Sequence, residues 1–403
     1  MKKHIVCIAS EFKGNEFLEE AQNAGWRVTL LTREDLSYAD WAWTSLNELR
    51  TVPSDSNEED YLREVVNIAV NQKIHHVVGM DEFDVLPSAR AREYLQIFKG
   101  MSRSHALRFR DKLTMRNIAS SNGVRCPEFS GVFNSNEVNE FLDSTAAPWI
   151  VKPRTEVSAF GIKKCAAKDD VWSVLNDLEN RETWRDHPSK FLIEQFIEGE
   201  VYHVDSVIYK GEVVAWGVNK YGTAPFQVAQ GGVFTTSTVR YDSDARAELL
   251  ELNKRLLQAL KHSNGVAHAE FLKADDNGEF YLVEVAARVG GAYIANVHEY
   301  ACGFNLWREW GKLETATEDN PYQPPKMIDE YAGIALALAN HEEPDTTHYV
   351  DEEIVYRVKK PNHVGLIFHS KNEEKLEALL EEYRSRISND FLKIAPVKER
   401  YDD

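Results

Sequence analysis

Two short apolar segments carry glutamate and arginine side chains at a spacing that suits cation and phosphate chemistry. Residues 266–272 and 280–286 are rich in residues that favour β-strands, and AspAspAsnGly stands between them. This pattern predicts a β-hairpin with a tight turn. The hairpin has one glutamate on each arm, Glu270 and Glu284, and Arg288 follows the second glutamate by four residues.

The two glutamates face each other if the hairpin is centred on Asn277. Carboxylates directly opposite on a sheet have Cβ atoms about 5 Å apart and repel each other, so a cation between them is favourable. Oxygen ligands of this kind suit Mg²⁺, which also binds nucleotide phosphates. Arg288 could then reach a phosphate or an oxyanion. The alternative is an edge ribbon with both glutamates in solvent, because a one-residue slip would break their opposition.

The composition is that of a globular protein with an acidic surface. The chain has 403 residues, of which 43% are hydrophobic and 28% charged, and its formal net charge is −18. This length predicts two or three lobes. The negative charge argues against nucleic acid and anionic membrane as main partners, but it leaves room for a local basic pocket that binds a nucleotide.

Cysteine usage and hydropathy favour a cytoplasmic protein. The cysteines are far apart and show neither zinc-binding spacing nor a disulfide framework: Cys7, Cys126, Cys165 and Cys302. The apolar run IVCIAS is too short for a signal peptide, and no stretch approaches the ~18 apolar residues of a membrane span. We therefore expect a reduced cytoplasmic location and no membrane partner.

The first part of the chain alternates strand and helix patterns. Strands are expected at 5–9, 26–31 and 75–79, and helices at 17–23 and 57–71. Such alternation predicts a parallel sheet. No GxGxxG motif follows the first strand, so the region is Rossmann-like in shape without the dinucleotide fingerprint.

The remaining segments are mainly strand-like, with three further helices. Helices are expected at 111–122, 244–262 and 372–388. Outside the hairpin, strands are expected at 149–153, 162–166, 191–196, 201–209, 212–218, 331–338, 354–358 and 363–368. The glycine-punctuated, aromatic segment 219–235 is expected to be a loop that folds over the site as a lid.

Five landmarks in this order resemble those of the ATP-grasp superfamily. They are AspLys at 111–112, ValLysPro at 151–153, GluGlnPheIleGluGly at 194–199, HisAlaGluPhe at 268–271 and GluValAlaAlaArgValGlyGly at 284–291. Each is weak alone, but together they are specific. The pattern Glu-x-small-x-Arg in the last landmark is similar to that of the carboxylate–amine ligases, especially the L-amino-acid (dipeptide) ligase group.

The resemblance implies an α/β protein with α+β lobes and the ATP-grasp fold. Residues 1–104 would form a Rossmann-like pre-ATP-grasp domain, and 105–196 the small ATP-grasp lobe with a phosphate flap. Residues 197–325 would form the large lobe with the metal site, and 326–403 a C-terminal α+β lobe.

The resemblance also places side chains on the nucleotide phosphates. Lys112 and Lys152 would bind them, with a solvent-facing lysine as the alternative for each. Ser158 and Gly161 belong to the flap at 154–161, which has only one glycine here although the family's flap is glycine-rich. Lys220 in the predicted lid is a further phosphate contact, and an exposed loop lysine is an equally good interpretation.

The segment 194–199 resembles the hinge that holds adenine. Its residues would act mainly through the main chain, which offers a donor and an acceptor to the flat edge of the base: Glu194, Gln195, Phe196 and Ile197. The family's ribose-binding glutamate is displaced by one position to Glu200, which puts that side chain on the opposite strand face. Asp205 in the same strand is either solvent-facing or functional.

The resemblance assigns the metal and the catalytic arginine to the hairpin. Glu270 and Glu284 would bind Mg²⁺, with Mn²⁺ as an alternative, and Ala286 stands where the family often has an asparagine. Arg288 would stabilise the transferred phosphoryl group or the tetrahedral intermediate. His268 shares the face of Glu270, and a hydrogen-bonded core histidine is the favoured interpretation.

The implied reaction is ATP-dependent amide or peptide bond formation between small molecules of the amino-acid class. A carboxylate would attack the γ-phosphate to give an acylphosphate and ADP, and an amine would then displace phosphate. One alternative is a carboxylase or nucleotide-biosynthesis ligase that uses bicarbonate or formate. Another is an inactive nucleotide-binding protein. The expected partners are a small carboxylate and a small amine, and a homodimer is left open.

Overall fold

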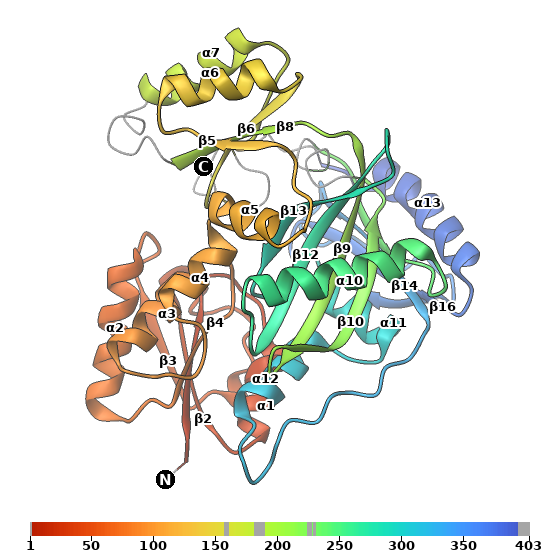
Figure 1. The fold of residues 1–403 in the computed structure, drawn as a ribbon. Coiled ribbons are helices and arrows are strands. Elements are labelled where there is room, and N and C mark those ends of the chain that lie inside the picture. The colour runs from red at the N-terminus through yellow and green to blue at the C-terminus, as the bar shows by residue number, and fades with distance from the viewer. Residues whose placement is uncertain (1, 157–160, 181–189, 224–227, 229–230, 394–403) are drawn as a thin grey trace.

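The structure, a computed structural model, describes residues 2–156, 161–180, 190–223, 228 and 231–393. Three β-sheets organise this part of the chain (Figure 1). A parallel sheet lies at the N-terminal end, a small antiparallel sheet stands at the top of the view, and the largest sheet carries the predicted hairpin. Among the described residues, no helix combines the length and the apolar character needed to cross a membrane.

The N-terminal sheet has the strand order β3-β2-β1-β4 with all pairs parallel. Its central strand β1 is buried at every residue, because a parallel sheet is covered on both faces. Because β1 and β4 are parallel neighbours, their carboxyl ends lie side by side. The elements of this region are β1 (His4–Ala9), α1 (Asn15–Asn23), β2 (Arg27–Arg33), β3 (Glu48–Val52), α2 (Glu58–Asn71), β4 (His76–Gly79) and α3 (Val85–Tyr94).

Two short helices lead into the small antiparallel sheet, which has the order β5-β8-β6-β7. Helices α6 and α7 lie over this sheet (Figure 1), and their apolar side chains form one core cluster with those of the sheet. The elements are α4 (Arg103–Arg110), α5 (Lys112–Ser121), β5 (Phe129–Gly131), α6 (Ser135–Ser144), β6 (Trp149–Pro153), β7 (Lys163–Cys165), α7 (Lys168–Asn180) and β8 (Phe191–Gln195).

The largest sheet has eight antiparallel strands in the order β13-β12-β9-β10-β11-β14-β16-β15. Its elements are β9 (Gly199–Tyr209), β10 (Glu212–Tyr221), β11 (Phe234–Thr238), α10 (Asp244–Ala259), β12 (Gly265–Ala274), β13 (Phe280–Ala286), α11 (Ile294–Cys302), α12 (Leu306–Thr315), β14 (Tyr331–Leu338), β15 (Ile354–Arg357), β16 (His363–Ser370) and α13 (Glu373–Asp390).

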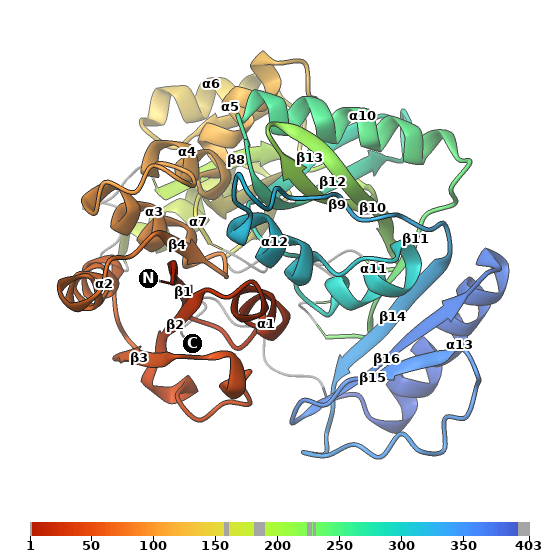
Figure 2. The same cartoon turned by 90° about the horizontal axis from the view of Figure 1, so that it is seen from below.

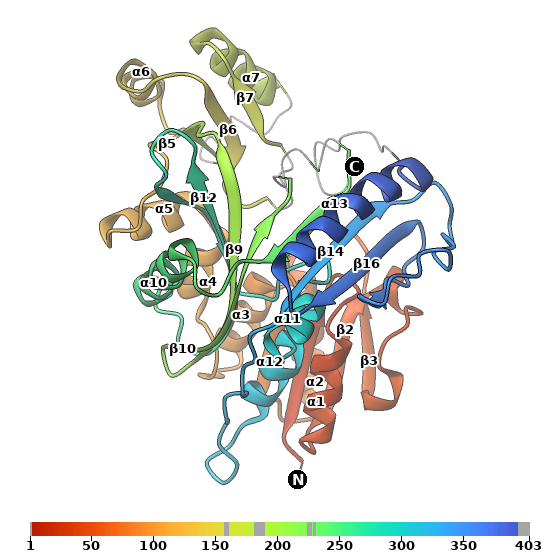
Figure 3. The same ribbon diagram turned by 90° about the vertical axis from the view of Figure 1, so that its right-hand side faces the viewer.

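Helices cover both faces of this central sheet. Helix α10 packs on one face, while α11 and α12 lie on the other and α12 also contacts α1 of the N-terminal region (Figure 2). Helix α13 lies along β14 and β16 (Figure 3). The N-terminal region is thereby joined to the back of the sheet that carries the hairpin.

The predicted strands and helices are confirmed as elements, with small differences at their ends. The expected lid is shorter than 219–235, because β10 continues to Tyr221 and β11 begins at Phe234. The C-terminal strands β14–β16 extend the central sheet and do not form a sheet of their own. The proposed domain boundaries stay a prediction.

Candidate active site

The hairpin has the register that the sequence predicts around the two glutamates. Glu270 pairs directly with Glu284, but Phe271 pairs with Leu282, so Val283 is an extra residue in β13. This bulge shifts the half of the hairpin nearer the turn by one residue. The opposition of the two carboxylates is therefore confirmed.

Glu284 forms an ion pair with Lys112 at the start of α5. The Lys112 Nζ atom lies 2.9 Å from a carboxylate oxygen of Glu284 and donates to the carbonyl of Glu156 at 2.7 Å. Lys112 is only 5% exposed. The alternative of a solvated surface lysine is therefore wrong, and Lys112 lies beside a predicted metal ligand.

The aspartate before Lys112 explains this placement. The Asp111 carboxylate caps α5 by accepting the N–H groups of Leu113 and Thr114 at 3.0 and 3.2 Å. The Nε atom of Arg154 donates to the same carboxylate at 3.0 Å, and the N–H of Lys112 donates to the Arg154 carbonyl at 2.9 Å. The start of α5 is thus fastened to the chain that leaves β6.

Glu270 is held by a tyrosine from β10 and by a histidine of its own strand β12. Its Oε1 atom accepts from the hydroxyl of Tyr221 at 2.7 Å and lies 3.3 Å from Nε2 of His268. Burial raises the pKa of Glu270, but the hydrogen bond and charge of His268 outweigh burial and lower it below its usual value. The carboxylate is therefore ionised and oriented.

A fully buried aspartate joins three histidines behind Glu270. The carboxylate oxygens of Asp205 are hydrogen-bonded to ring nitrogens of His203 at 2.6 Å, His268 at 2.8 Å and His298 at 3.0 Å. Burial lowers the pKa of His268, yet Asp205 raises it to about 9, so this imidazole is charged near neutral pH. The core interpretation of His268 is confirmed, and the solvent-facing alternative for Asp205 is wrong because its side chain is 0% exposed.

The same cluster has the residue types of a metal site but is already satisfied by hydrogen bonds. Ligand atoms of His203, Asp205 and His298 lie within 4.8 Å of one another. Both imidazoles bond to one oxygen of Asp205, at 2.6 and 3.0 Å. This arrangement is that of a polar network that fixes the position of His268.

Gly290 makes room for this network. A Cβ atom at Gly290 would lie 2.9 Å from Nδ1 of His268 and 3.0 Å from Oδ1 of Asp205. At Gly291 a Cβ atom would meet nothing within 4 Å. A residue without a Cβ atom is therefore required at Gly290, where the backbone approaches the histidine–aspartate pair closely, and not at Gly291.

Lys152 lies in a buried triad with Glu194 and Arg116. The Glu194 carboxylate accepts from Lys152 at 2.6 Å and from Nε of Arg116 at 2.7 Å. Burial lowers the pKa of Lys152 to about 8 even though Glu194 raises it. Burial raises the pKa of Glu194, but the two cations outweigh burial and lower it to about 2. The expectation that Glu194 matters mainly through its main chain is wrong, because its side chain balances two buried charges.

Arg116 also connects the hinge to the metal-ligand hairpin. Its Nη2 atom donates to the carbonyl of Val283, the bulge residue, at 2.7 Å. Its Nη1 atom is buried without a hydrogen-bond partner among the described residues. Sequence reasoning missed Arg116, although its position four residues after Lys112 puts both side chains on one face of α5.

The hinge backbone is partly engaged in the small sheet. The N–H groups of Gln195 and Phe196 donate to the carbonyls of Glu128 and Pro148 at 2.8 and 2.9 Å. The N–H of Ile197 makes no backbone hydrogen bond within the described part of the chain. Ile197 is therefore the hinge residue best able to donate to a base.

Arg288 meets the N-terminal region at the carboxyl end of β4. Its Nε atom donates to Glu82 at 2.9 Å, and Arg110 donates to the other oxygen of Glu82 at 2.7 Å. Burial lowers the pKa of Arg288, but Glu82, Asp81 and Glu284 raise it above its usual value. The arginine is thus held, charged, between the sheet edge and the hairpin.

Sequence reasoning missed Asp81 and Glu82. Asp81 pairs with Lys13 from the loop after β1, and both carboxylates are nearly inaccessible to solvent. The available signal was the acidic run AspGluPheAsp directly after a parallel strand, since ligands of open α/β sheets bind at the carboxyl ends of strands.

The structure does not bring Lys220 to the carboxylates. Lys220 lies in β10 opposite Tyr202, so strand alternation places it on the α10 face, away from Glu270. There its Nζ atom pairs with Glu200 at 2.5 Å. The expected phosphate contact of Lys220 is therefore not supported. Glu200 lies on the same face as Lys220, away from Glu270, as its position one residue early predicts.

The flap and the lid are described only in part. Ser158 lies outside the described residues, as do 224–227 and 229–230 of the expected lid. Gly161 is described and has a φ of +69°, a conformation that favours glycine.

The residues that converge here fit a nucleotide and a divalent cation. Lys112 and Lys152 are buried cations, and the charge of Lys112 contributes to the lowered pKa of Lys152. Two carboxylates face each other beside them, and Arg116 has a buried N–H with no hydrogen-bond partner among the described residues. Clustered buried cations call for an anionic ligand, and paired carboxylates suit Mg²⁺.

Comparison with known proteins agrees with this geometry. Residues 145–296 match the family of ATP-grasp domains, a family that binds ATP. The chain is 25% identical over 255 residues to an L-arginine-specific L-amino acid ligase from Bacillus subtilis, covering 62% of this chain and 59% of that protein. It is 23% identical over 188 residues to a D-alanine–D-alanine ligase from Neisseria gonorrhoeae, covering 43% of this chain and 56% of that protein. The chain thus spans less than two thirds of these curated relatives.

The fold agrees over nearly the whole chain. A crystal structure of an L-amino acid ligase from Bacillus licheniformis superposes with a TM-score of 0.75 at 18% identity, covering 98% of this chain and 99% of that one. The expected fold is thereby confirmed. Residues 145–296 thus match an ATP-grasp domain, and in sequence and fold the chain resembles the L-amino-acid ligase group.

Proposed function

We propose that this protein is an ATP- and Mg²⁺-dependent carboxylate–amine ligase that joins two small molecules of the amino-acid class. The observation that carries the proposal is the direct opposition of Glu270 and Glu284 beside the buried cations Lys112 and Lys152 and the half-buried Arg288. The similarity to two relatives named as amino-acid ligases supports an amine as the second substrate.

The first step activates the acid. Lys112 and Lys152 bind the phosphates of ATP, and Glu270 and Glu284 hold Mg²⁺, which when bound neutralises phosphate charge. A carboxylate oxygen of the acid forms a bond to the γ-phosphorus while the bond from that phosphorus to the oxygen of ADP breaks. When ATP is bound, Lys112 leaves its ion pair with Glu284 and binds the phosphates instead.

The second step forms the amide. The amine attacks the acyl carbon of the acylphosphate, phosphate leaves with the bonding electron pair, and the amine proton passes to solvent. Arg288 is placed to stabilise the negative oxygens of the intermediate, because Glu82 fixes its Nε side. Water would hydrolyse the acylphosphate, so the reaction requires a site from which water is excluded.

Product analysis tests the proposal. Purified protein is incubated with ATP, Mg²⁺ and a panel of amino acids, and ADP, AMP, phosphate and ligated products are measured. We expect ADP, phosphate and product in equal amounts. AMP and pyrophosphate would exclude the acylphosphate route, and turnover that needs bicarbonate in place of an amine would identify a carboxylase instead.

Matched variants separate this activity from a contaminating ATPase. Glu284→Gln keeps the size of the side chain but removes a ligand charge, so turnover should fall by orders of magnitude while the fold is retained. Glu279→Gln changes an exposed glutamate on the same hairpin and should remain active. Equal activity of both variants would contradict the proposal.

The location is proposed on chemical grounds. All four cysteines are free thiols in the structure. Free thiols and an ATP-dependent reaction fit the reducing cytoplasm. We propose a cytoplasmic location on this basis.

A further inference from the structure

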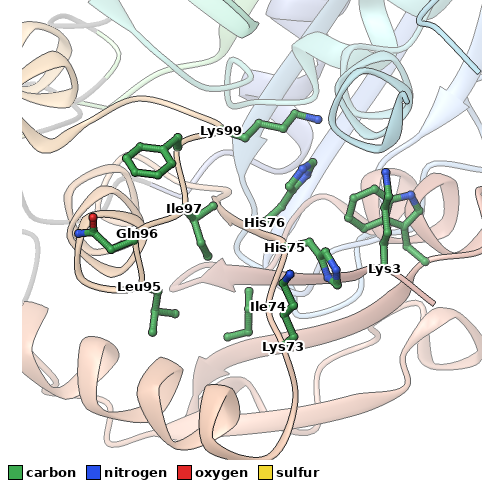
Figure 4. A pocket seen from close by; sticks show the side chains of 11 residues that line it. Lys3, Lys73, Ile74, His75, His76, Leu95, Gln96, Ile97 and Lys99 are labelled. Atoms are coloured by element: carbon green, nitrogen blue, oxygen red, sulfur yellow. The ribbon is translucent and has the colours of Figure 1, made fainter. Parts of the chain in front are cut away.

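A second pocket lies at the amino ends of the strands of the N-terminal sheet. Its cavity of about 320 Å³ is formed where β1, β2 and β4 begin and where the chain turns between α3 and α4 (Figure 4). Lys13, Asp81 and Glu82 follow the carboxyl ends of β1 and β4, which are at the opposite end of the strands. The pocket is therefore separate from the candidate active site.

The pocket has an apolar floor and a basic rim. Trp26, Ile74 and His76 are between 5% and 8% exposed and lie at the bottom. Lys3 and Lys73 are exposed at the rim. Lys99, His75 and the 90% exposed Phe98 complete the wall, and of the residues that line it in the described part of the chain none is acidic.

Two of these lysines have no counter-charge among the residues that the structure describes. No ion pair joins Lys3 or Lys73 to any described carboxylate, although the chain carries 65 acidic and 47 basic residues. Lys3 lies over the indole of Trp26, with its Nζ atom 5.4 Å from the ring centroid. In so acidic a protein, unpaired lysines around one concavity mark a local positive potential.

The neighbouring histidines respond to this potential. Burial lowers the pKa of His75, and Lys73 and Lys3 lower it further. Burial also lowers the pKa of His76 to about 3, with a further contribution from Lys99. Both imidazoles are therefore neutral at pH 7. Nδ1 of His75 accepts the N–H of His4 at 3.0 Å, which leaves its Nε2–H to donate to a ligand.

One carboxylate stands behind the wall. Glu314 on α12 lies 3.8 Å from Nζ of Lys99, and its backbone carbonyl accepts from that lysine at 2.6 Å. Lys99 is thus partly neutralised and structural. Lys3 and Lys73 remain the charges that are available to a ligand.

We propose that this pocket binds a small phosphate monoester with an aromatic or short apolar body. The cavity is larger than a phosphate ion requires, and its floor is an indole and an isoleucine, so a ligand with a flat apolar part fits better than a bare anion. The ammonium groups of Lys3 and Lys73 bind the dianionic phosphate at the rim, where lysines act as point charges.

Side-chain NMR of histidine tests this directly on the wild-type protein. The protein is labelled on its 13 histidines and titrated with phenyl phosphate, inorganic phosphate and phenol. We expect saturable shifts of the His75 and His76 signals with phenyl phosphate, weaker shifts with phosphate and none with phenol. The signal of His363, in the distant strand β16, should not move.

A pair of double variants provides the control. Lys3→Gln with Lys73→Gln should weaken phenyl phosphate binding about tenfold, because two rim charges are lost. Lys254→Gln with Lys371→Gln removes two exposed lysines elsewhere and should leave binding unchanged. Equal affinities of the two double variants, or no saturable shift of His75 and His76 in the wild type, would overturn the proposal.

Discussion

Glu194→Gln should destabilise the hinge region and make it depend on nucleotide. In the structure the carboxylate balances Lys152 and Arg116, and the side chains of all three residues are at most 7% exposed. Removing its charge leaves two buried cations without an anion. Breaking a buried ion pair in this way costs about 3–5 kcal/mol.

The lower end of that range is expected at neutral pH. Burial already lowers the pKa of Lys152 to about 8, so the variant can relieve repulsion by releasing the proton of Lys152, at about 1.4 kcal/mol for each pH unit. The destabilisation should therefore be about 3 kcal/mol at pH 7 and should decrease as the pH rises through about 8. Above that pH Lys152 is neutral in the wild type as well.

Hydrogen exchange of β6 and β8 measures this local stability. The control is Glu279→Gln, which breaks an exposed pair with Arg125 and should cost less than about 1 kcal/mol. ATP should protect the Glu194→Gln variant more than it protects the wild type, because the triphosphate replaces the missing negative charge beside Lys152. Equal protection by ATP, or a loss as small as that of the control, would refute the assignment of Lys152 to the phosphates.

Three further predictions follow from the site. Arg288→Ala should lower kcat by at least about a hundredfold while the Kd for ATP changes little; equal loss of both would make Arg288 a structural residue. Burial lowers the pKa of Lys152 to about 8, so ATP affinity should fall as the pH rises through that value, and a Lys152→Arg variant that keeps the same pH dependence would contradict this. Gly290→Ala pushes a Cβ atom against the network behind Glu270, so it should lower the free energy of unfolding by about 1–3 kcal/mol and weaken metal binding. Gly291→Ala should change neither quantity. Similar effects of the two variants in calorimetry would contradict the steric argument.

Local patterns were sufficient to predict most of the fold. Strands such as Phe280–Ala286 and Tyr331–Leu338 match their predicted bounds, because apolar runs and turn residues delimit them clearly. The segments that were missed include the short edge strand β3 and also α12, although the apolar face of α12 and its capping Asn305 were available signals. The joining of β14–β16 to the central sheet could not be predicted, since pairing between distant strands leaves no local trace.

The candidate site was predictable where residues are close in sequence or in hairpin register. Near the turn Leu272 pairs with Tyr281, a register that by itself would put Glu270 opposite Val283, and the bulge at Val283 restores the predicted opposition of Glu270 and Glu284. The triad of Lys152, Glu194 and Arg116 joins three separate elements, so only the folded chain reveals that the Glu194 side chain is engaged.

Lys220 illustrates the opposite failure. It was expected in a loop, but β10 extends through it. Strand alternation then turns its side chain to the face away from Glu270. A loop assignment that is wrong by three residues was enough to place a charge on the wrong side of the sheet.

The most direct test of the central claim is the position of the metal in a crystal grown with a non-hydrolysable ATP analogue and Mn²⁺. Anomalous diffraction at the manganese edge should give a peak between the carboxylates of Glu270 and Glu284, in contact with the triphosphate, with Lys112 moved onto the phosphates. A peak elsewhere, with Glu284 still paired to Lys112 and Glu270 still on Tyr221, would contradict the account.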